Sequence, residues 1–187
     1  MDEAITRVER AAAAVDPVMA AVTPADLPRP TPCEGWDLRQ LLDHFFGNLH
    51  RWAARLSGGD AGQPTPALAD GGDDVENAWR NARDALLEAL RRPGAVDREV
   101  ALPDGRVTNS RMLVTIMPVE LMLHGWDTAR ALGASTDLDA HLADELVEIA
   151  RPLMAGAGRG SSFGEEQEAP TGCSAADRLA AFSGRRV

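Results

Sequence analysis

The sequence predicts an all-α protein: an antiparallel four-helix bundle with additional short helices and a small hairpin. Apolar residues recur at helical spacing over five long segments, whereas the alternation typical of a strand is weak and confined to residues 96–108. Stretches rich in glycine and proline separate these segments. At 187 residues, 44% of them hydrophobic, the chain is long enough to form one domain with a proper core.

The first two expected helices lie on either side of a proline-rich connector. The first helix spans about residues 2–22, with Pro17 as an expected kink. Residues 23–36 contain four prolines and so cannot be helical throughout. The second helix runs from an N-cap at Asp37 to about Ser57. Its apolar stripe consists of Leu38, Leu41, Leu42, Phe45, Leu49, Trp52 and Leu56.

The third and fourth helices flank the segment that shows weak alternation. We expect the third over about residues 73–92 and the fourth over about 109–132. The segment between them contains an Asp-Gly pair and predicts a small hairpin or an irregular crossing. The fourth helix is apolar nearly all round, which predicts that it lies deepest in the fold, and Pro118 interrupts it.

The C-terminal part is expected to add a fifth helix and a tail. The fifth helix follows Asp137 and ends near Ala157. Ser174 is placed to cap a short last helix. We therefore expect residues 1–160 to form the bundle and residues 161–187 to form a tail, with its short helix packed on the same domain.

Charge and composition exclude several classes of protein. The net charge of −10 argues against a general nucleic-acid binder, because contact with phosphates needs a basic surface. No apolar run approaches 20 residues, and the first ten residues lack the layout of a signal peptide, so we expect a cytoplasmic protein without a membrane span. The two cysteines, Cys33 and Cys173, are too few for a disulfide scaffold and form no Cys-x-x-Cys pair.

Glu120 and His124 are the candidate functional pair. They share one stripe of the fourth helix with Leu113, Ile116 and Met117, and that stripe is expected to face a core. A buried carboxylate and a buried imidazole are costly unless they find partners. Their i, i+4 spacing leaves two interpretations open: a buried hydrogen-bonded pair, which is the commoner case, or two ligands of one metal ion.

A metal ion would need a third protein ligand, for which His44 is the best candidate. It lies on a flank of the second helix, a side that still faces a neighbouring helix in a four-helix bundle. His50 and His141 are expected to be surface residues. Cys33 is expected to be a small connector residue and not a nucleophile, because no basic residue lies next to it.

Two windows of the sequence, residues 31–44 and 120–133, resemble the metal-binding domain of mycothiol-dependent maleylpyruvate isomerase. That domain belongs to the wider DinB-like superfamily of four-helix bundles, so the resemblance implies this fold. It also implies a divalent metal, zinc in the isomerase and with nickel as the alternative, held by His44, Glu120 and His124. In the isomerase an arginine on the third helix assists the substrate, and Arg80 and Arg83 are the candidates here.

The resemblance implies a mycothiol-dependent transferase or isomerase that acts on a small electrophilic substrate. A metal with three protein ligands keeps an open position, where a thiol would be deprotonated. Asp127 is a candidate acceptor that would orient a metal ligand. Two other functions stay open: a metal-dependent hydrolase of a small substrate, and a non-catalytic, metal-stabilised binding or regulatory module. The substrate is also open, and so is the oligomeric state, with a homodimer among the alternatives.

Overall fold

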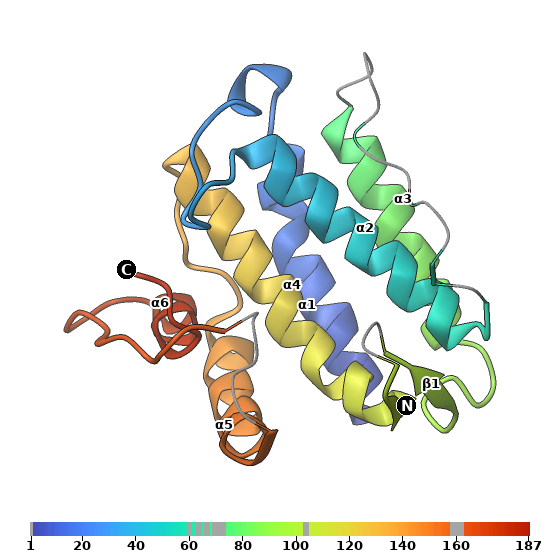
Figure 1. The fold of residues 1–187 in the computed structure, drawn as a ribbon. Helices are drawn as coiled ribbons and strands as arrows, with labels where there is room; N and C mark the ends of the chain where they lie inside the picture. Colours follow the sequence, from blue (N-terminus) through green and yellow to red (C-terminus); the bar gives the residue numbers. More distant parts are fainter. Residues whose placement is uncertain are drawn as a thin grey trace.

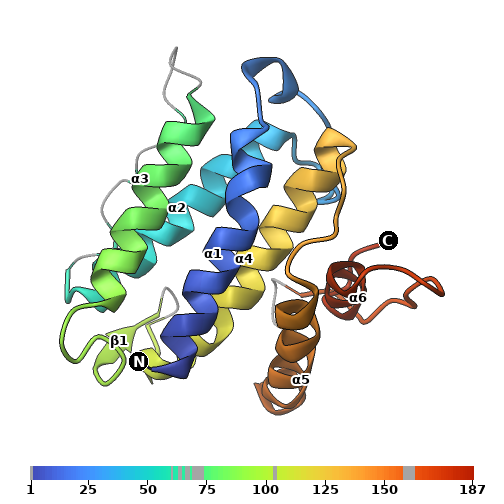
Figure 2. The ribbon, with the colours of Figure 1, turned by 180° about the vertical axis from the view of Figure 1, so that it is seen from behind.

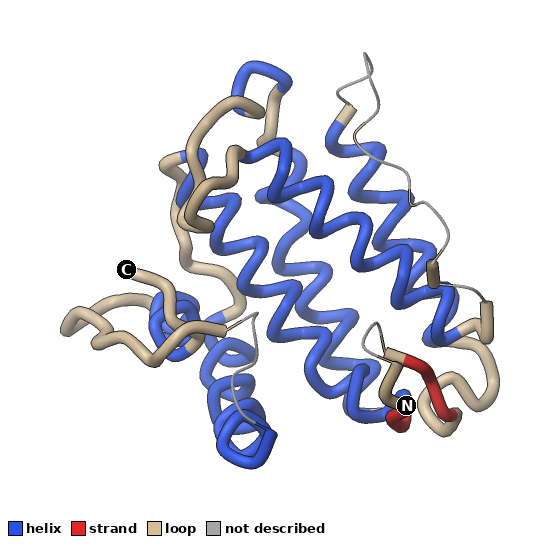
Figure 3. Tube along the Cα trace, viewed as in Figure 1, coloured by secondary structure: helices blue, strands red, loops and turns tan. Residues whose placement is uncertain are grey.

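The computed structural model of the chain describes residues 2–59, 61–62, 65, 68, 74–102, 105–157 and 163–187. Within these ranges the chain is helical apart from loops and one two-stranded hairpin, which confirms the predicted all-α class (Figure 3). The helices are α1 (Glu3–Ala20), α2 (Leu38–Leu56), α3 (Val75–Leu90), α4 (Ser110–Leu132), α5 (Ala140–Ala157) and α6 (Ala175–Phe182), with a short 3-10 turn at Pro24–Asp26. The hairpin pairs β1 (Glu99–Ala101) with β2 (Val107–Asn109) in antiparallel register.

Helices α1 to α4 form the bundle (Figures 1 and 2). Helix α1 packs mainly against α4, and α2 mainly against α3. The helices of each pair run in the same direction, and the two pairs run antiparallel to each other. Thus Asp2, which caps α1, binds Arg111 in the first turn of α4, whereas Trp79 near the start of α3 binds Asp16 near the end of α1.

Helices α5 and α6 lie outside the bundle, beside α4, and α6 packs mainly against α5 (Figure 1). The segment 163–187, which contains α6, therefore lies next to the bundle. The expected boundary at residues 160/161 lies outside the described residues, as does Asp104 of the hairpin turn.

Side-chain caps set several helix ends, and they explain most of the agreement with the predicted boundaries. The Asp37 carboxylate accepts a hydrogen bond from the backbone of Gln40, and the Gln40 side chain accepts one from the backbone of Asp37. Ser174 and Asp177 form the same reciprocal arrangement at the start of α6. The start of α5 lies later than expected, because Asp139, and not Asp137, accepts the hydrogen bond from the first turn.

Helix α4 is the most deeply buried helix, as its composition predicts. Residues 121–129 are all buried. Pro118 lies inside the helix without ending it. At Gly125 an added Cβ would lie 2.6 Å from Cγ2 of Val15, so the glycine permits the close approach of α1 and α4. On the same helix, His124 is buried and Glu120 is half-buried.

Within the described residues, every helix is too short or too polar to span a bilayer.

Candidate functional site

A cavity of about 540 Å³ lies between α2 and α4. The hairpin contributes Leu102 to its wall, the loop before α2 contributes Cys33 and Trp36, and the C-terminal segment contributes Phe163 and Arg185. The helices supply the remaining lining residues: His44, Asn48, Arg51, Trp52, Arg55, Leu113, Glu120, Leu123 and His124. The cavity is therefore built from segments that lie far apart in the sequence.

All three predicted metal ligands line this cavity. The ring centroids of His44 and His124 lie 5.4 Å apart, and the rings are nearly perpendicular. Nε2 of His124 lies 3.6 Å from Oε2 of Glu120. His124 is 6% exposed, and the Glu120 side chain is 19% exposed at the cavity. The structure thus brings together an imidazole from α2 with an imidazole and a carboxylate from α4.

These three side chains do not satisfy one another by hydrogen bonding. The 3.6 Å between Glu120 and His124 exceeds a normal hydrogen-bond length. Nδ1 of His124 lies 3.4 Å from Oδ2 of Asp127, but this buried nitrogen makes no hydrogen bond to a described residue. Nε2 of His44 is 3.0 Å from the side-chain nitrogen of Asn48. In their present rotamers, no group of three or more His, Cys, Asp or Glu side chains among the described residues is arranged to hold a metal ion.

The charges around Glu120 favour the ionised form of its carboxyl group. Burial alone raises the pKa of Glu120, but contact with His124 and the nearby His44 and Arg185 outweigh it, so the pKa is lowered. Burial lowers the pKa of His124, yet Asp127 and Glu120 together raise it. Burial and the positive charge of His124 lower the pKa of His44, which keeps that imidazole neutral at neutral pH, the form in which it ligates metals.

Behind His124, an ion pair joins α4 to the C-terminal segment. Asp127 is fully buried, and Arg185 donates to both of its carboxylate oxygens, from Nε and Nη2, at 2.8 Å each. Nη1 of Arg185 also donates to the hydroxyl of Ser183. Burial raises the pKa of Asp127, but Arg185 and His124 outweigh that effect and lower it. Asp127 is therefore a buried anion that faces His124.

Sequence reasoning missed Arg185. It lies beyond the last helix, in a stretch without periodicity or motif, so no local signal indicates that its side chain points inward. The only pointer in the sequence is indirect: a carboxylate on the inner part of α4 needs a cation, and the sequence does not say which arginine supplies it.

Cys33 lines the cavity with its sulfur 3.6 Å from Oδ2 of Asp127. Burial and the negative charge of Asp127 raise the pKa of this thiol to about 12. Because the thiolate is the nucleophilic form, this raised pKa argues against Cys33 as a nucleophile at neutral pH.

The structure does not bring Arg80 or Arg83 to the site. Arg80 pairs with Glu76 on the exposed side of α3, and Arg83 binds Asp16 and Asp84. Neither lines the cavity, because α3 turns its apolar face towards the bundle and these arginines lie off that face. The arginines that do line the cavity are Arg51, Arg55 and Arg185.

The two remaining histidines also lie away from the cavity. His141 is exposed on α5, as expected, whereas His50 on α2 is half-buried. Neither is among the residues that line the cavity between α2 and α4.

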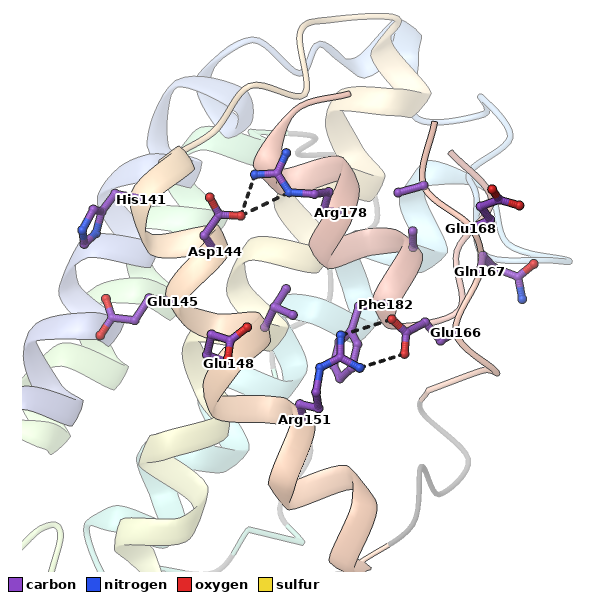
Figure 4. A pocket seen from close by; sticks show the side chains of 13 residues that line it. His141, Asp144, Glu145, Glu148, Arg151, Glu166, Gln167, Glu168, Arg178 and Phe182 are labelled. Carbon is purple, nitrogen blue, oxygen red and sulfur yellow. Dashed lines mark hydrogen bonds and ion pairs between the residues drawn. The ribbon is translucent and has the colours of Figure 1, made fainter. Parts of the chain in front are cut away.

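A larger cavity of about 720 Å³ lies between α5, α6 and residues 166–169 (Figure 4). Its arginines are already neutralised, Arg151 by Glu166 and Arg178 by Asp144. The only imidazole in its lining belongs to His141. Size alone therefore does not identify the functional site, and the chemistry favours the cavity between α2 and α4.

The chain is similar to one known family of proteins. The family model for the mycothiol maleylpyruvate isomerase N-terminal domain matches residues 8–129, a range that includes His44, Glu120 and His124 but not Arg185. The chain is 34% identical over 184 residues to an uncharacterized protein of Mycobacterium tuberculosis strain CDC 1551 / Oshkosh and to one of strain ATCC 25618 / H37Rv. Each alignment covers 96% of this chain and 96% of the relative.

Two solved structures share the fold. A crystal structure of a mycothiol-dependent maleylpyruvate isomerase aligns with a TM-score of 0.55 at 18% identity, over 67% of this chain and 59% of the isomerase chain. A histidine-to-alanine mutant of such an isomerase aligns with a TM-score of 0.67 at 16% identity, over 88% of this chain and 73% of the other. The chain therefore spans roughly three fifths to three quarters of the isomerase chains that it matches.

Proposed function

The chain belongs to the mycothiol maleylpyruvate isomerase N-terminal domain family, and on that premise we propose that the cavity between α2 and α4 binds a divalent metal and uses mycothiol to act on a small electrophilic substrate. The observation that carries the proposal is the meeting of His44, Glu120 and His124 from two helices at one cavity. The natural setting of this activity would be the cytoplasm.

We propose zinc as the metal, with nickel as the alternative, and His44, Glu120 and His124 as its protein ligands. The donor set fits, because two imidazoles and one carboxylate suit zinc and leave an open position. A metal bound there would supply the positive charge that lowers the pKa of an incoming thiol. A metal bound through Nε2 of His44 would replace the contact of that nitrogen with Asn48. Asp127, Arg185 and Cys33, which lie next to the ligands, support such a site.

Asp127 and Arg185 would hold the His124 imidazole in the orientation that metal binding needs. The Asp127 carboxylate lies on the Nδ1 side of the imidazole, so it would hold the proton there and leave Nε2 to face Glu120 and the cavity. Arg185 fixes Asp127 through two hydrogen bonds and compensates its buried charge. Cys33 stays protonated beside them and so would not compete with an external thiol.

Metal analysis tests the first half of the proposal. Purified protein loaded with zinc and then desalted is expected to retain about one ion per chain, with tetrahedral coordination by three protein ligands. His124→Ala and His44→Ala are expected to lose it, whereas His141→Ala, on the exposed side of α5, should retain it. Equal zinc retention by all of these variants would refute the assignment of ligands.

Thiol-dependent turnover tests the second half. With zinc and mycothiol present, the protein is expected to consume an electrophilic substrate such as maleylpyruvate, and removal of mycothiol should abolish the reaction. Turnover without any thiol would instead support the metal-dependent hydrolase. Zinc-loaded protein that neither binds mycothiol nor consumes electrophiles would contradict the proposal and favour a metal-stabilised binding module, although a cavity of about 540 Å³ beside the ligands is unexpected in a purely structural site.

A further inference from the structure

The wall that α2 presents to the cavity carries two arginines that the proposed chemistry does not use. His44, Asn48, Arg51 and Arg55 follow one another at spacings of four, three and four residues, which places them along one face of the helix. Asn48 links the first two turns of this face: its side-chain nitrogen contacts His44, and its oxygen accepts a hydrogen bond from Nη2 of Arg51 at 2.6 Å. Along this face, the proposed metal ligand His44 is thus followed by two cations, Arg51 and Arg55.

Arg51 and Arg55 lack counter-ions among the residues that the structure describes. Arg51 donates to Asn48, and Nε of Arg55 donates to the backbone oxygen of Ala101 at 3.1 Å. No described carboxylate lies within ion-pair distance of either guanidinium. The contrast with the other cavity is clear in Figure 4, where each arginine side chain binds a carboxylate. In a chain with 29 acidic and 19 basic residues, two neighbouring half-buried arginines without such a partner need an explanation.

The two guanidinium groups also repel each other. Burial lowers the pKa of Arg55, and the charge of Arg51 lowers it further. Holding like charges together at a cavity wall costs free energy unless a ligand supplies the missing negative charge. Guanidinium groups bind compact oxyanions well, because their planar donors match two oxygen atoms at once.

We propose that Arg51 and Arg55 form an anion-binding wall that selects substrates carrying a compact oxyanion, held about two to three helical turns along α2 from His44. Trp36, Trp52 and Leu113 supply apolar surface in the same cavity, so the ligand class is a small organic anion. This inference deepens the proposed function by naming the substrate class of that cavity and rests on it for the reaction, but anion binding itself requires neither metal nor thiol.

The test measures binding to protein treated with a chelator, so that no metal contributes. Maleate serves as the probe, dimethyl maleate as its uncharged counterpart and inorganic phosphate as a second oxyanion. Tryptophan fluorescence reports binding, because Trp36 and Trp52 line the cavity. We expect saturable binding of maleate that weakens with salt, and no response to the ester at the same concentrations. Saturation by phosphate alone would also support the wall and would assign it to a phosphorylated substrate.

The double variant Arg51→Gln/Arg55→Gln is expected to weaken oxyanion binding by about 10- to 100-fold, the loss typical of hydrogen bonds to charged groups. Arg92→Gln, which removes an exposed arginine paired with Glu88, is the matched control and should bind as the unmodified protein does. Circular dichroism should show the double variant as folded, since the change removes a repulsion. Equal affinity in the double variant, an equal response to the ester, or binding of neither anion would overturn the inference.

The same variants separate this inference from the proposed function. Arginine-dependent maleate binding in a protein that holds no zinc and shows no thiol-dependent turnover would leave the anion wall standing and the proposed function refuted. Zinc binding and thiol-dependent turnover, with a maleate affinity that does not depend on either arginine, would support the proposed function and refute the anion wall.

Discussion

Asp127 is the single residue on which the interior of the site depends most. Its carboxylate is fully buried on α4, and its two strong hydrogen bonds come from Arg185, 58 residues later in the chain. An exposed pair of this kind would contribute little, but a buried charge that loses its partner is strongly destabilising. The Arg185 side chain therefore compensates the negative charge that Asp127 carries in the interior of the protein.

Arg185→Met should lower the free energy of unfolding by about 3–5 kcal/mol, because it leaves the Asp127 carboxylate buried without a cation. Urea denaturation at neutral pH measures this loss. The double variant Asp127→Asn/Arg185→Met should recover much of it, since no charge then remains buried. Arg178→Met, which breaks an exposed pair with Asp144, should cost about 0–1 kcal/mol. A double variant no more stable than Arg185→Met would show that the pair is not the source of the effect.

The same pair predicts the acid sensitivity of the metal-free protein. Arg185 and His124 outweigh burial and lower the pKa of Asp127 in the folded state, below the value of about 3.9 for an unfolded chain. The stabilisation is therefore complete above the unfolded pKa and is lost as the pH falls towards the folded pKa. Below about pH 4 the free energy of unfolding should decrease more steeply for the unmodified protein than for Asp127→Asn/Arg185→Met. Parallel curves from urea titrations in this range would contradict the assignment.

At the scale of the elements, α1 and α4 approach each other closely at Gly125. A methyl group there would lie 2.6 Å from Cγ2 of Val15 and 3.5 Å from Cδ1 of Leu138, so the side chains or the helices would have to move. The tripeptide Gly-Trp-Asp, which occurs at residues 35–37 and 125–127, thus has unrelated roles: Gly35 has a positive φ in a loop, whereas Gly125 is a helical contact point.

Gly125→Ala should destabilise the protein by about 1–3 kcal/mol through overpacking, reduced by up to about 1 kcal/mol because alanine favours the helix. Thermal and urea unfolding measure the net effect. Val15→Ala removes the methyl group that collides, so Val15→Ala/Gly125→Ala should be more stable than the sum of the two single changes predicts. Strict additivity would mean that the two positions do not meet.

Helix positions were predictable from the sequence, whereas helix directions were not. Caps such as Asp37 and Ser174 are local, so the chain reveals them without its neighbours. A hydrophobic stripe shows which face of a helix is buried but not which partner covers it. The parallel pairing of α1 with α4, and of α2 with α3, is a property of the packed bundle and has no counterpart in any one segment.

At the scale of the whole molecule, some residues of the site were predictable from the sequence and others were not. Glu120 and His124 were predicted because both lie on one buried stripe. His44 was predicted because a metal would need a third ligand, and the family resemblance then implied the same residue. Arg51 and Arg55 carried a usable signal, since they lie on the same face of α2 as His44, but helical periodicity does not indicate that this face lines a cavity. Arg185 carried none, because its position depends on how the C-terminal segment packs beside α4.

The proposed metal joins α2 to α4, so it should stabilise the whole bundle. A ligand that binds only the folded state at 100 times its dissociation constant adds about 2.7 kcal/mol, which corresponds to a rise of about 5–10 °C in Tm for a chain of this size. Differential scanning calorimetry with zinc, compared with chelator, measures the shift. His44→Ala and His124→Ala, on different helices, should both abolish it, whereas His141→Ala should retain it.

The shift should also depend on pH, because protons compete with the metal for the imidazoles. In the metal-free protein, Asp127 and Glu120 outweigh the effect of burial and raise the pKa of His124, so this imidazole is charged up to a higher pH than an ordinary histidine. Zinc must displace that proton, and the rise in Tm should therefore be largest above neutral pH and shrink as the pH falls towards 5. A zinc-induced shift that is constant over this range, or that persists in His124→Ala, would place the ion elsewhere in the molecule.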